Sequence, residues 1–217
     1  MKTILSTKKL SLAQKEHLLN AQLAVVDVDF ITTAPISFSV TEKEVVNAIF
    51  SSLNGVKAVL DKGITIKNYF CVGKRTESLL NELNIKVEHC APNAKALSEY
   101  IITNHKDKSY HYFCAKDRLE ILPNALTKNR IKWKEIPVYK TIYTPKKYEQ
   151  EFDGVLFFSP SGVESFFSNN SLTGHSFCIG NTTAKALKKY TEQYTVASQP
   201  SIENVLVKVI KHFKSND

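Results

Sequence analysis

The sequence is poor in glycine and proline, and it has no long apolar run. Only 7 of its 217 residues are Gly and 7 are Pro, which excludes collagen-like and low-complexity chains. No run of about 18 apolar residues occurs, so we expect no transmembrane helix and no membrane partner. The apolar stretch near the N-terminus is too short and too interrupted for a signal peptide, so we expect a cytoplasmic protein.

Cysteine is also scarce, and its spacing fits neither a metal site nor a redox pair. Cys71, Cys90, Cys114 and Cys178 include no CxxC pair, and His89 beside Cys90 is an isolated pair of ligand types. We therefore expect no bound metal. Cys71 and Cys178 lie in apolar runs, which is typical of small hydrophobic core residues in a reduced protein.

Acidic residues are outnumbered, since 21 Asp and Glu stand against 29 Lys and Arg, for a net charge of +8. A basic surface suits an anionic partner. Three interpretations compete: binding of nucleic acid, binding of a small polyanion, or a charge that only keeps the protein soluble. Long basic runs and the RRM, zinc-finger and helix-turn-helix patterns are missing, so we expect no nucleic-acid partner.

Runs of strand length alternate with segments of helix length along the whole chain. Strands are expected at 2–7, 22–30, the residues before Ser51, 68–73, 85–91, 109–115, 133–143, 154–159, 176–180 and 194–198. Helices are expected at 10–19, after Ser51, and at 74–83, 93–104, 121–129, 162–167, 182–190 and 201–213. This alternation predicts an α/β fold with parallel sheets flanked by helices.

Part of the chain is repeated. IFSSLNGVKAVL (49–60) matches LFFSPSGVESFF (156–167) at an offset of 157 − 50 = 107 residues, and YFCVGKRTESLL (69–80) matches SFCIGNTTAKAL (176–187) at the same offset. The repeats cover roughly 45–105 and 153–213. We therefore predict two similar domains, each of about five strands.

The second repeat has too few strands for a sheet, so residues 1–30 are expected to fold back onto it. Domain 1 is then discontinuous, 1–32 plus 142–217, and domain 2 is the inserted block 35–138. The chain crosses between them near 31–35 and 137–143, where two extended segments could pair as a two-stranded β linker. Proline is tolerated in such a linker because it is all edge.

The repeated motifs place small polar residues between a strand and a helix, where ligands of α/β sheets bind. Helix N-termini offer free N–H groups to carboxylates or phosphates. The candidate binding residues are Ser52, Asn54, Gly73, Thr76, Ser159, Ser161, Gly162, Gly180, Thr182 and Thr183. The alternative, that they are ordinary caps and turns, stays open. If both domains face a common cleft, it would suit a ligand with several anionic groups.

No nucleophile elbow, Walker A, GxGxxG or HExxH motif is present, and the six histidines show no catalytic spacing. The chemistry of an enzyme built this way would depend mainly on binding and orientation.

Several segments together resemble the uroporphyrinogen-III synthase family. They are FFSPSGVESF, CIGNTTAKAL, IFSSLNGVKAV, CVGKRTESL and ILPNALTKNRIKWKEIPVYKT, and the match runs over nearly the whole chain. The resemblance implies two α/β domains joined by a two-stranded linker. It also implies closure of hydroxymethylbilane, a linear tetrapyrrole with eight carboxylates, to uroporphyrinogen III with loss of water and inversion of ring D. No cofactor is implied, and we expect a monomer.

The resemblance also suggests residue roles. Tyr139 stands at the family's VYxT tyrosine and is the candidate proton donor to the departing hydroxyl, although it could instead be a packing residue of the linker. Lys8 stands where the family has arginine, which keeps the charge but loses the bidentate fork. The family's arginine before LPxxL is replaced by Leu119, and Lys116 or Arg118 could substitute for it.

Two other functions remain open beside the synthase. In a non-enzymatic two-domain binder of a small polyanion, Tyr139→Phe would leave the affinity for that ligand unchanged, and no other property would be lost. A nucleic-acid binder would show a steep salt dependence.

Overall fold

The structure, a computed structural model, describes residues 1–214 and contains two compact units. Unit 1 is made of residues 1–32 together with the described residues from Ile142 onward, and unit 2 is residues 33–141. Residues 215–217, assigned to domain 1 in the sequence analysis, lie outside the described part.

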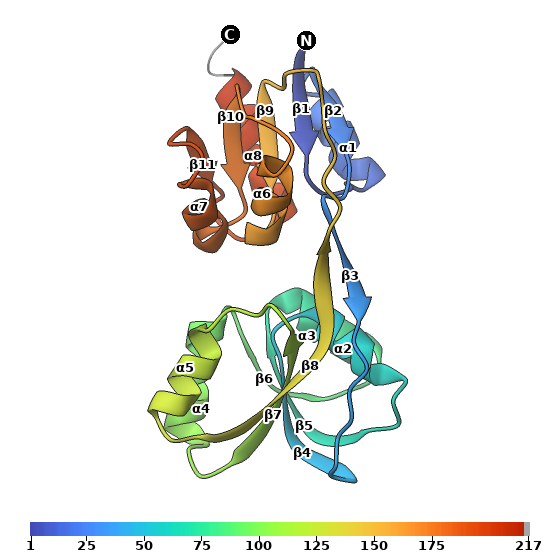
Figure 1. Ribbon diagram of the computed structural model, residues 1–217, viewed down its shortest axis with the longest axis vertical. Helices are drawn as coiled ribbons and strands as arrows, with labels where there is room; N and C mark the ends of the chain where they lie inside the picture. Colours follow the sequence, from blue (N-terminus) through green and yellow to red (C-terminus); the bar gives the residue numbers. More distant parts are fainter. Residues whose placement is uncertain (215–217) are drawn as a thin grey trace. The chain divides into compact units, whose positions relative to one another are not determined.

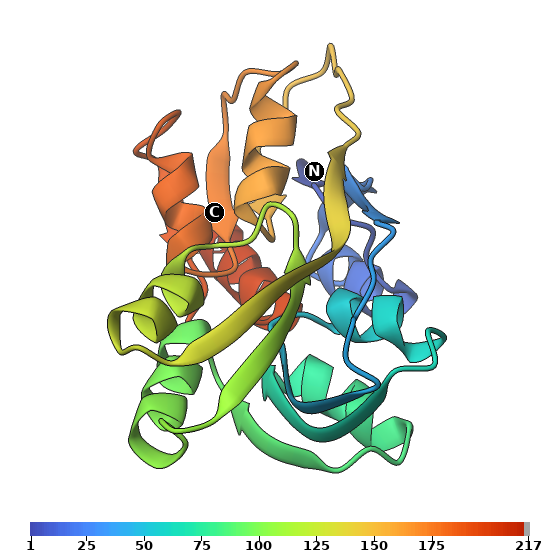
Figure 2. The ribbon, with the colours of Figure 1, turned by 60° about the horizontal axis from the view of Figure 1, so that its bottom comes forward.

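Unit 2 is a parallel sheet with helices on both faces. The sheet order is β8-β7-β4-β5-β6, with β3 beyond β8. Helices α2 and α3 cover one face and α4 and α5 the other (Figures 1 and 2). Its elements are β4 (Glu44–Phe50), α2 (Leu53–Leu60), β5 (Thr65–Val72), α3 (Lys74–Glu82), β6 (Val87–Ala91), α4 (Ala94–Asn104), β7 (Ser109–Ala115) and α5 (Ile121–Lys128), with β3 (Ile31–Pro35) and β8 (Lys132–Tyr143) crossing its boundary.

Unit 1 is a second parallel sheet, in the order β11-β10-β9-β1-β2. Helices α6 and α7 pack on one face, and α1 and α8 pack on the other. Its elements are β1 (Lys2–Ser6), α1 (Leu12–Leu19), β2 (Leu23–Asp27), β9 (Gly154–Phe157), α6 (Pro160–Phe167), β10 (His175–Cys178), α7 (Asn181–Leu187), β11 (Tyr194–Val196) and α8 (Ile202–Lys214).

The two units have the same strand order. In position within the sheet, β4, β5, β6, β7 and β8 of unit 2 correspond to β9, β10, β11, β1 and β2 of unit 1. The N-terminal strands β1 and β2 therefore complete the sheet that the second repeat begins. The predicted fold class, two similar α/β domains with parallel sheets flanked by helices, is confirmed.

Strands β3 and β8 pair with each other, as expected for the linker, and Figure 1 draws their arrows in opposite directions. The bounds of β8 agree with the predicted strand 133–143 to within one residue, but the strand does more than link the units. It is also the partner of β7, so Pro137 lies opposite Cys114 inside the sheet. The register shifts just beyond this pair, and such an irregularity accommodates a residue that has no N–H to donate.

Each unit has its own aromatic core. In unit 2 the rings of Phe50 and Phe113 stack with centroids 5.3 Å apart, and both side chains are buried. Cys71 and Cys178 are buried free thiols, as the sequence predicts, and Cys114 is buried as well. Burial raises the pKa of Cys178 to about 11, so its thiol stays protonated and unreactive at neutral pH.

A histidine pair in unit 1 makes stability depend on pH. The ring of His175 stacks on that of His212, with centroids 4.3 Å apart, and its Nε2 lies 2.9 Å from the Thr195 hydroxyl. Burial first, and the neighbouring His212 second, lower the pKa of His175 below its ordinary 6.5. The unfolded chain therefore binds this proton more tightly, and stability is lost as the pH falls through about 6.5.

We expect thermal unfolding to move to lower temperature between about pH 7.5 and 5.5, and this loss to be shallower in His175→Gln. Circular dichroism melts at matched ionic strength measure both. Parallel curves for the two proteins would contradict the assignment.

Candidate functional site

The strand order defines one crevice in unit 2. From β4 the chain proceeds to β5 and β6 on one side, whereas β7 and β8 lie on the other. Ligands of open α/β sheets bind at such a switch point, outside the carboxyl ends of the strands. Ser51 and Ser52 follow β4 there, and Lys116 follows β7. The predicted loop therefore lies at the favoured position.

Ser52 brings the two parts of the predicted site in unit 2 together. It is the N-cap of α2, and its side chain accepts a hydrogen bond from the Asn54 N–H at 3.1 Å. Its hydroxyl also lies close enough to the phenol of Tyr139 on β8 to act on the pKa of that phenol, and Tyr139 packs on the cluster that contains Val56 of α2. The structure thus places the candidate acid beside a candidate binding residue 139 − 52 = 87 positions away.

Tyr139 is partly buried, and its surroundings favour the neutral phenol. Burial raises its pKa above the ordinary 10, against a smaller opposing effect of the nearby Ser52 hydroxyl. A phenol in this state keeps its proton at neutral pH and can donate a hydrogen bond to a bound group. The side chain packs on the cluster that includes Phe50, Val56 and Phe113, so its ring is fixed.

Gly55 allows α2 to approach β7 closely enough for this arrangement. A Cβ at this position would lie 3.0 Å from the carbonyl oxygen of Phe113, a backbone atom that cannot move aside easily. The glycine shared by the two repeats therefore brings the first turn of α2 against the sheet, and Ser52 with it.

The loop before α3 has a different geometry. Gly73 has φ +84°, and its carbonyl accepts the N–H groups of Thr76 and Glu77. A nearby pocket of about 350 Å³ is lined by Lys57, Lys74 and Arg75 among others, so this end of unit 2 is cationic. Lys74 is already paired with Glu77 at 2.8 Å.

The repeat-matched glycines before α3 and α7 give a controlled test of backbone strain. A Cβ on Gly73 or Gly180 would meet nothing within 4 Å, but Gly73 has φ +84° whereas Gly180 is extended at −179°. We expect Gly73→Ala to lower the free energy of unfolding by about 1–2 kcal/mol, because only its backbone is left-handed. Gly180→Ala is the control and should cost less than about 0.5 kcal/mol in the same urea titration. Equal losses would contradict this explanation.

Unit 1 builds the corresponding loop around Ser159. This residue caps α6, accepting the Gly162 N–H at 3.0 Å, and its hydroxyl lies 3.1 Å from that of Ser161. The buried Thr7 hydroxyl donates to the Leu156 carbonyl at 2.7 Å and joins the ends of β1 and β9. Lys8 follows β1 at the same end of the sheet, and its side chain is exposed. These residues meet at the switch point of unit 1.

The threonines of the motifs differ in access. Thr182 is exposed at the start of α7. Thr76 and Thr183 are only 3% and 1% exposed, so their hydroxyls lie under the helix starts rather than on the open surface. Of the predicted hydroxyl donors, Ser52, Ser159, Ser161 and Thr182 are the accessible ones.

The two cations proposed to replace the family's arginine have different surroundings. Arg118 is held by ion pairs to Glu120 and Glu135, both at 2.6 Å, and it lies over the ring of Trp133. Lys116 has an exposed side chain, and its backbone N–H donates to the backbone carbonyl of Tyr139 at 2.8 Å. Lys116 is therefore the better placed of the two to meet an anion.

Sequence reasoning missed Tyr112, a buried tyrosine of β7 whose hydroxyl lies 2.7 Å from the Ser51 hydroxyl. The available signal was its apolar strand, SYHYFCA, in which a buried tyrosine needs a hydrogen-bond partner.

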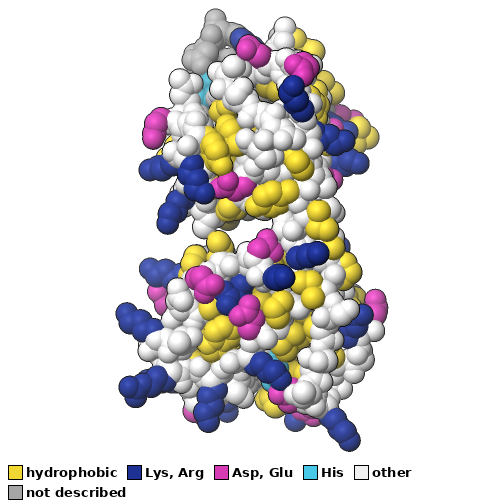
Figure 3. All heavy atoms as spheres, viewed as in Figure 1, with side chains coloured by type: hydrophobic (Ala, Val, Ile, Leu, Met, Phe, Trp, Pro, Cys, Tyr) yellow, Lys and Arg dark blue, Asp and Glu magenta, His cyan; other side chains and the backbone are white. Residues whose placement is uncertain are grey.

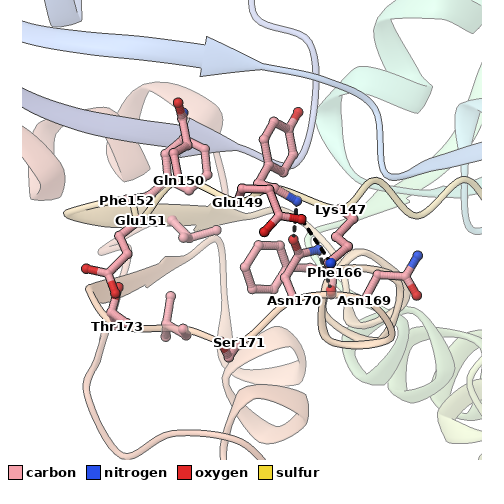
Figure 4. Close-up of a pocket in the computed structure, with 13 residues that line it drawn as sticks. Lys147, Glu149, Gln150, Glu151, Phe152, Phe166, Asn169, Asn170, Ser171 and Thr173 are labelled. Atoms are coloured by element: carbon pink, nitrogen blue, oxygen red, sulfur yellow. Dashed lines mark hydrogen bonds and ion pairs between the residues drawn. The ribbon is translucent and has the colours of Figure 1, made fainter.

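Other features of the structure lie away from these loops. A pocket of about 300 Å³ in unit 1 lies between the segment 147–152 before β9 and the segment 169–173 after α6 (Figure 4). Its Asn170 side chain is already hydrogen-bonded to the Tyr148 N–H and to the Lys146 and Phe166 carbonyls. The pocket therefore belongs to the packing of this connection, and no predicted site residue lines it.

Surface charge and metal ligands add little to the site. On the face shown in Figure 3, Lys and Arg are interleaved with Asp and Glu rather than gathered in one stripe. Among residues 1–214, no cluster of three or more His, Cys, Asp or Glu side chains is placed to hold a metal ion. Nor does any helix in that range have the length and apolar content needed to cross a membrane.

Comparisons with known proteins agree with one another. The family model described as uroporphyrinogen-III synthase HemD matches residues 15–206. A porphyrin biosynthesis protein HemD of Ruminiclostridium josui is 27% identical over 193 residues, which cover 75% of this chain and 37% of that protein. The chain thus spans little more than a third of the length of that relative.

Two crystal structures share the fold. That of uroporphyrinogen-III synthetase from Helicobacter pylori has a TM-score of 0.76 at 19% identity, covering 98% of this chain and all of that one. That of a mutant uroporphyrinogen III synthase from Thermus thermophilus has a TM-score of 0.67 at 12% identity, covering both chains fully.

Proposed function

The chain belongs to the uroporphyrinogen-III synthase family, and we propose that it closes hydroxymethylbilane to uroporphyrinogen III with loss of water and inversion of ring D. The family match over residues 15–206 supports the reaction. The observation that carries the chemistry is the partly buried phenol of Tyr139, which packs beside the start of α2 at the switch point of unit 2 and is kept neutral there.

Tyr139 is the proposed acid. Its phenol donates a proton to the hydroxyl of the substrate, the C–O bond breaks, and the oxygen keeps the bonding pair and leaves as water. The cation left on the exocyclic carbon is attacked by the substituted carbon of ring D, which gives a spiro intermediate. The original bond between that ring D carbon and its bridge carbon then breaks, and the freed bridge carbon bonds to the other α-carbon of ring D, which inverts the ring. The proton lost from that α-carbon balances the one that Tyr139 gave.

The loops of each unit are proposed to bind substrate carboxylates. Backbone N–H groups at helix starts are suited to such groups, and accessible hydroxyls add donors. In unit 2 these are the turns at Ser52, Asn54, Gly73 and Thr76, and in unit 1 those at Lys8, Ser159, Ser161, Gly162, Gly180, Thr182 and Thr183. We propose that Thr76 and Thr183, being buried, act by shaping their turns.

The setting proposed for the reaction follows the same reasoning. The protein would act as a cytoplasmic monomer on a small molecule and without a cofactor. Buried free thiols suit a reducing compartment, and the neutral phenol gives the one proton that the reaction needs.

The experiment is to supply freshly prepared hydroxymethylbilane, oxidise the products and separate the type I and type III porphyrins by chromatography. We expect type III to dominate with the protein and type I, the spontaneous product, to dominate without it. Type I alone in the presence of the protein would refute the proposal and leave the non-enzymatic polyanion binder, which equilibrium binding of the same substrate would reveal.

A further inference from the structure

The turn after β4 lies between two tyrosines. Its serines are consecutive: the Ser51 hydroxyl is hydrogen-bonded to that of Tyr112 at 2.7 Å, and the Ser52 hydroxyl lies near the phenol of Tyr139. Tyr112 packs in the cluster formed with α4 and α5, whereas Tyr139 packs beside the cluster formed with α2 and α3. The two phenols therefore reach the turn from opposite sides.

The bond between Tyr112 and Ser51 is a fixed one. Tyr112 is 3% exposed, and β7 holds it in register opposite Ile49 of β4. Burial raises the pKa of Tyr112 to about 12, so the phenol stays neutral over the working range and the hydrogen bond persists. Breaking it would leave a buried hydroxyl without its partner, which is costly.

Unit 1 shows that the fold does not need this bond. At the offset of the repeat, Phe158 stands where unit 2 has Ser51. In the sheet, Ser6 of β1 lies opposite Leu156, the counterpart of Ile49, and so occupies the place of Tyr112. The same strand-turn-helix forms there with a capping Ser159 and without a tyrosine pair. Folding alone therefore gives no reason for the Tyr112–Ser51 pair in unit 2.

We propose that Tyr112 is a positioning residue, which fixes the Ser51–Ser52 turn and so holds Ser52 in place beside the catalytic Tyr139. This inference rests on the proposed function. It assigns the precise placement of the acid to a residue that does not touch the substrate. Without the bond to Tyr112, the turn could move by a few tenths of an ångström relative to Tyr139, enough to misdirect its proton.

The test compares Tyr112→Phe with Tyr110→Phe. Tyr110 is on the same strand and 1% exposed, and its hydroxyl donates to the His105 carbonyl, so the control also removes one buried tyrosine hydrogen bond. We expect Tyr112→Phe to lower kcat by about three- to tenfold with KM nearly unchanged, and to lower the type III share. Tyr110→Phe should match the unaltered protein in kcat and in the type III share.

Ser51→Ala should reproduce the loss, and the double variant with Tyr112→Phe should be no slower than either single one. Additive losses, or equal losses in Tyr110→Phe, would overturn the inference. A crystal structure of Tyr112→Phe tests it without turnover, since the Ser51–Ser52 turn should have shifted relative to Tyr139, and an unchanged turn would refute it. If the unaltered protein yields type I alone, the proposed function fails. The crystal structure of Tyr112→Phe then still shows whether Tyr112 fixes the Ser51–Ser52 turn.

Discussion

Tyr139→Phe is expected to lower kcat about a hundredfold, the lower end of what a positioned acid contributes, while KM changes little. The phenol is the group that the structure holds neutral and beside Ser52, and phenylalanine keeps its ring in the same cluster. Loss of the proton donor without loss of packing should therefore affect the chemical step. Initial rates with fresh hydroxymethylbilane and separation of the porphyrin isomers measure it.

The matched control is Tyr69→Phe, which removes another partly buried phenol from the same cluster, where Tyr69 stacks on Phe50 at 5.9 Å. It should leave kcat within about twofold. Because the pKa of Tyr139 is raised above 10, the unaltered protein should show no loss of kcat from this proton between about pH 7 and 9. A Tyr139→Phe protein as fast as the control would show that Tyr139 only packs in the linker.

Phe113→Ala is expected to have the largest effect on stability, a loss of about 3–5 kcal/mol in the free energy of unfolding. Phe113 is fully buried, stacks on Phe50 with 10° between the rings, and meets the edge of Phe38. Removing the ring leaves a cavity that the strands around it cannot close. A loss of this size is a large part of a domain's total stability.

Urea titration followed by Trp133 fluorescence measures this loss, because Trp133 is the chain's one tryptophan and lies in unit 2. Leu60→Ala on α2, where the side chain is 40% exposed, serves as the control and should cost less than about 1 kcal/mol. Similar midpoints for the two variants would mean that the ring at 113 contributes little to the core.

The fold could be predicted because its signals are local. Short apolar runs and amphipathic segments indicated strands and helices, and the offset between Phe50 and Phe157 indicated two similar domains. The bounds of β8 were predicted within one residue, but its partner was not, since Pro137 suggested an edge linker. The structure also pairs this strand with β7, which outweighs the missing N–H at one position.

The site could be predicted only in part, because it depends on contacts between distant residues. Ser52 and Ser159 were found as helix caps, which sequence spacing reveals. The approach of Tyr139 to the start of α2 could not be foreseen, since it depends on which side of β8 faces that helix. Nor does the sequence tell that Thr183 turns inward while its neighbour Thr182 is exposed.

The sheet of unit 1 combines β1 and β2 with strands that are made much later, β9 to β11, and this has a consequence for folding during translation. During translation unit 2 has all its strands once β8 has left the ribosome, whereas β1 and β2 must wait for β9 before they join more than each other. Unit 2 is therefore expected to fold first, and unit 1 only after β9, β10 and β11 have been synthesised. A ribosome stalled before residue 154 would carry a folded unit 2 and the strands β1 and β2 without the rest of their sheet, the form most exposed to chaperones and proteases.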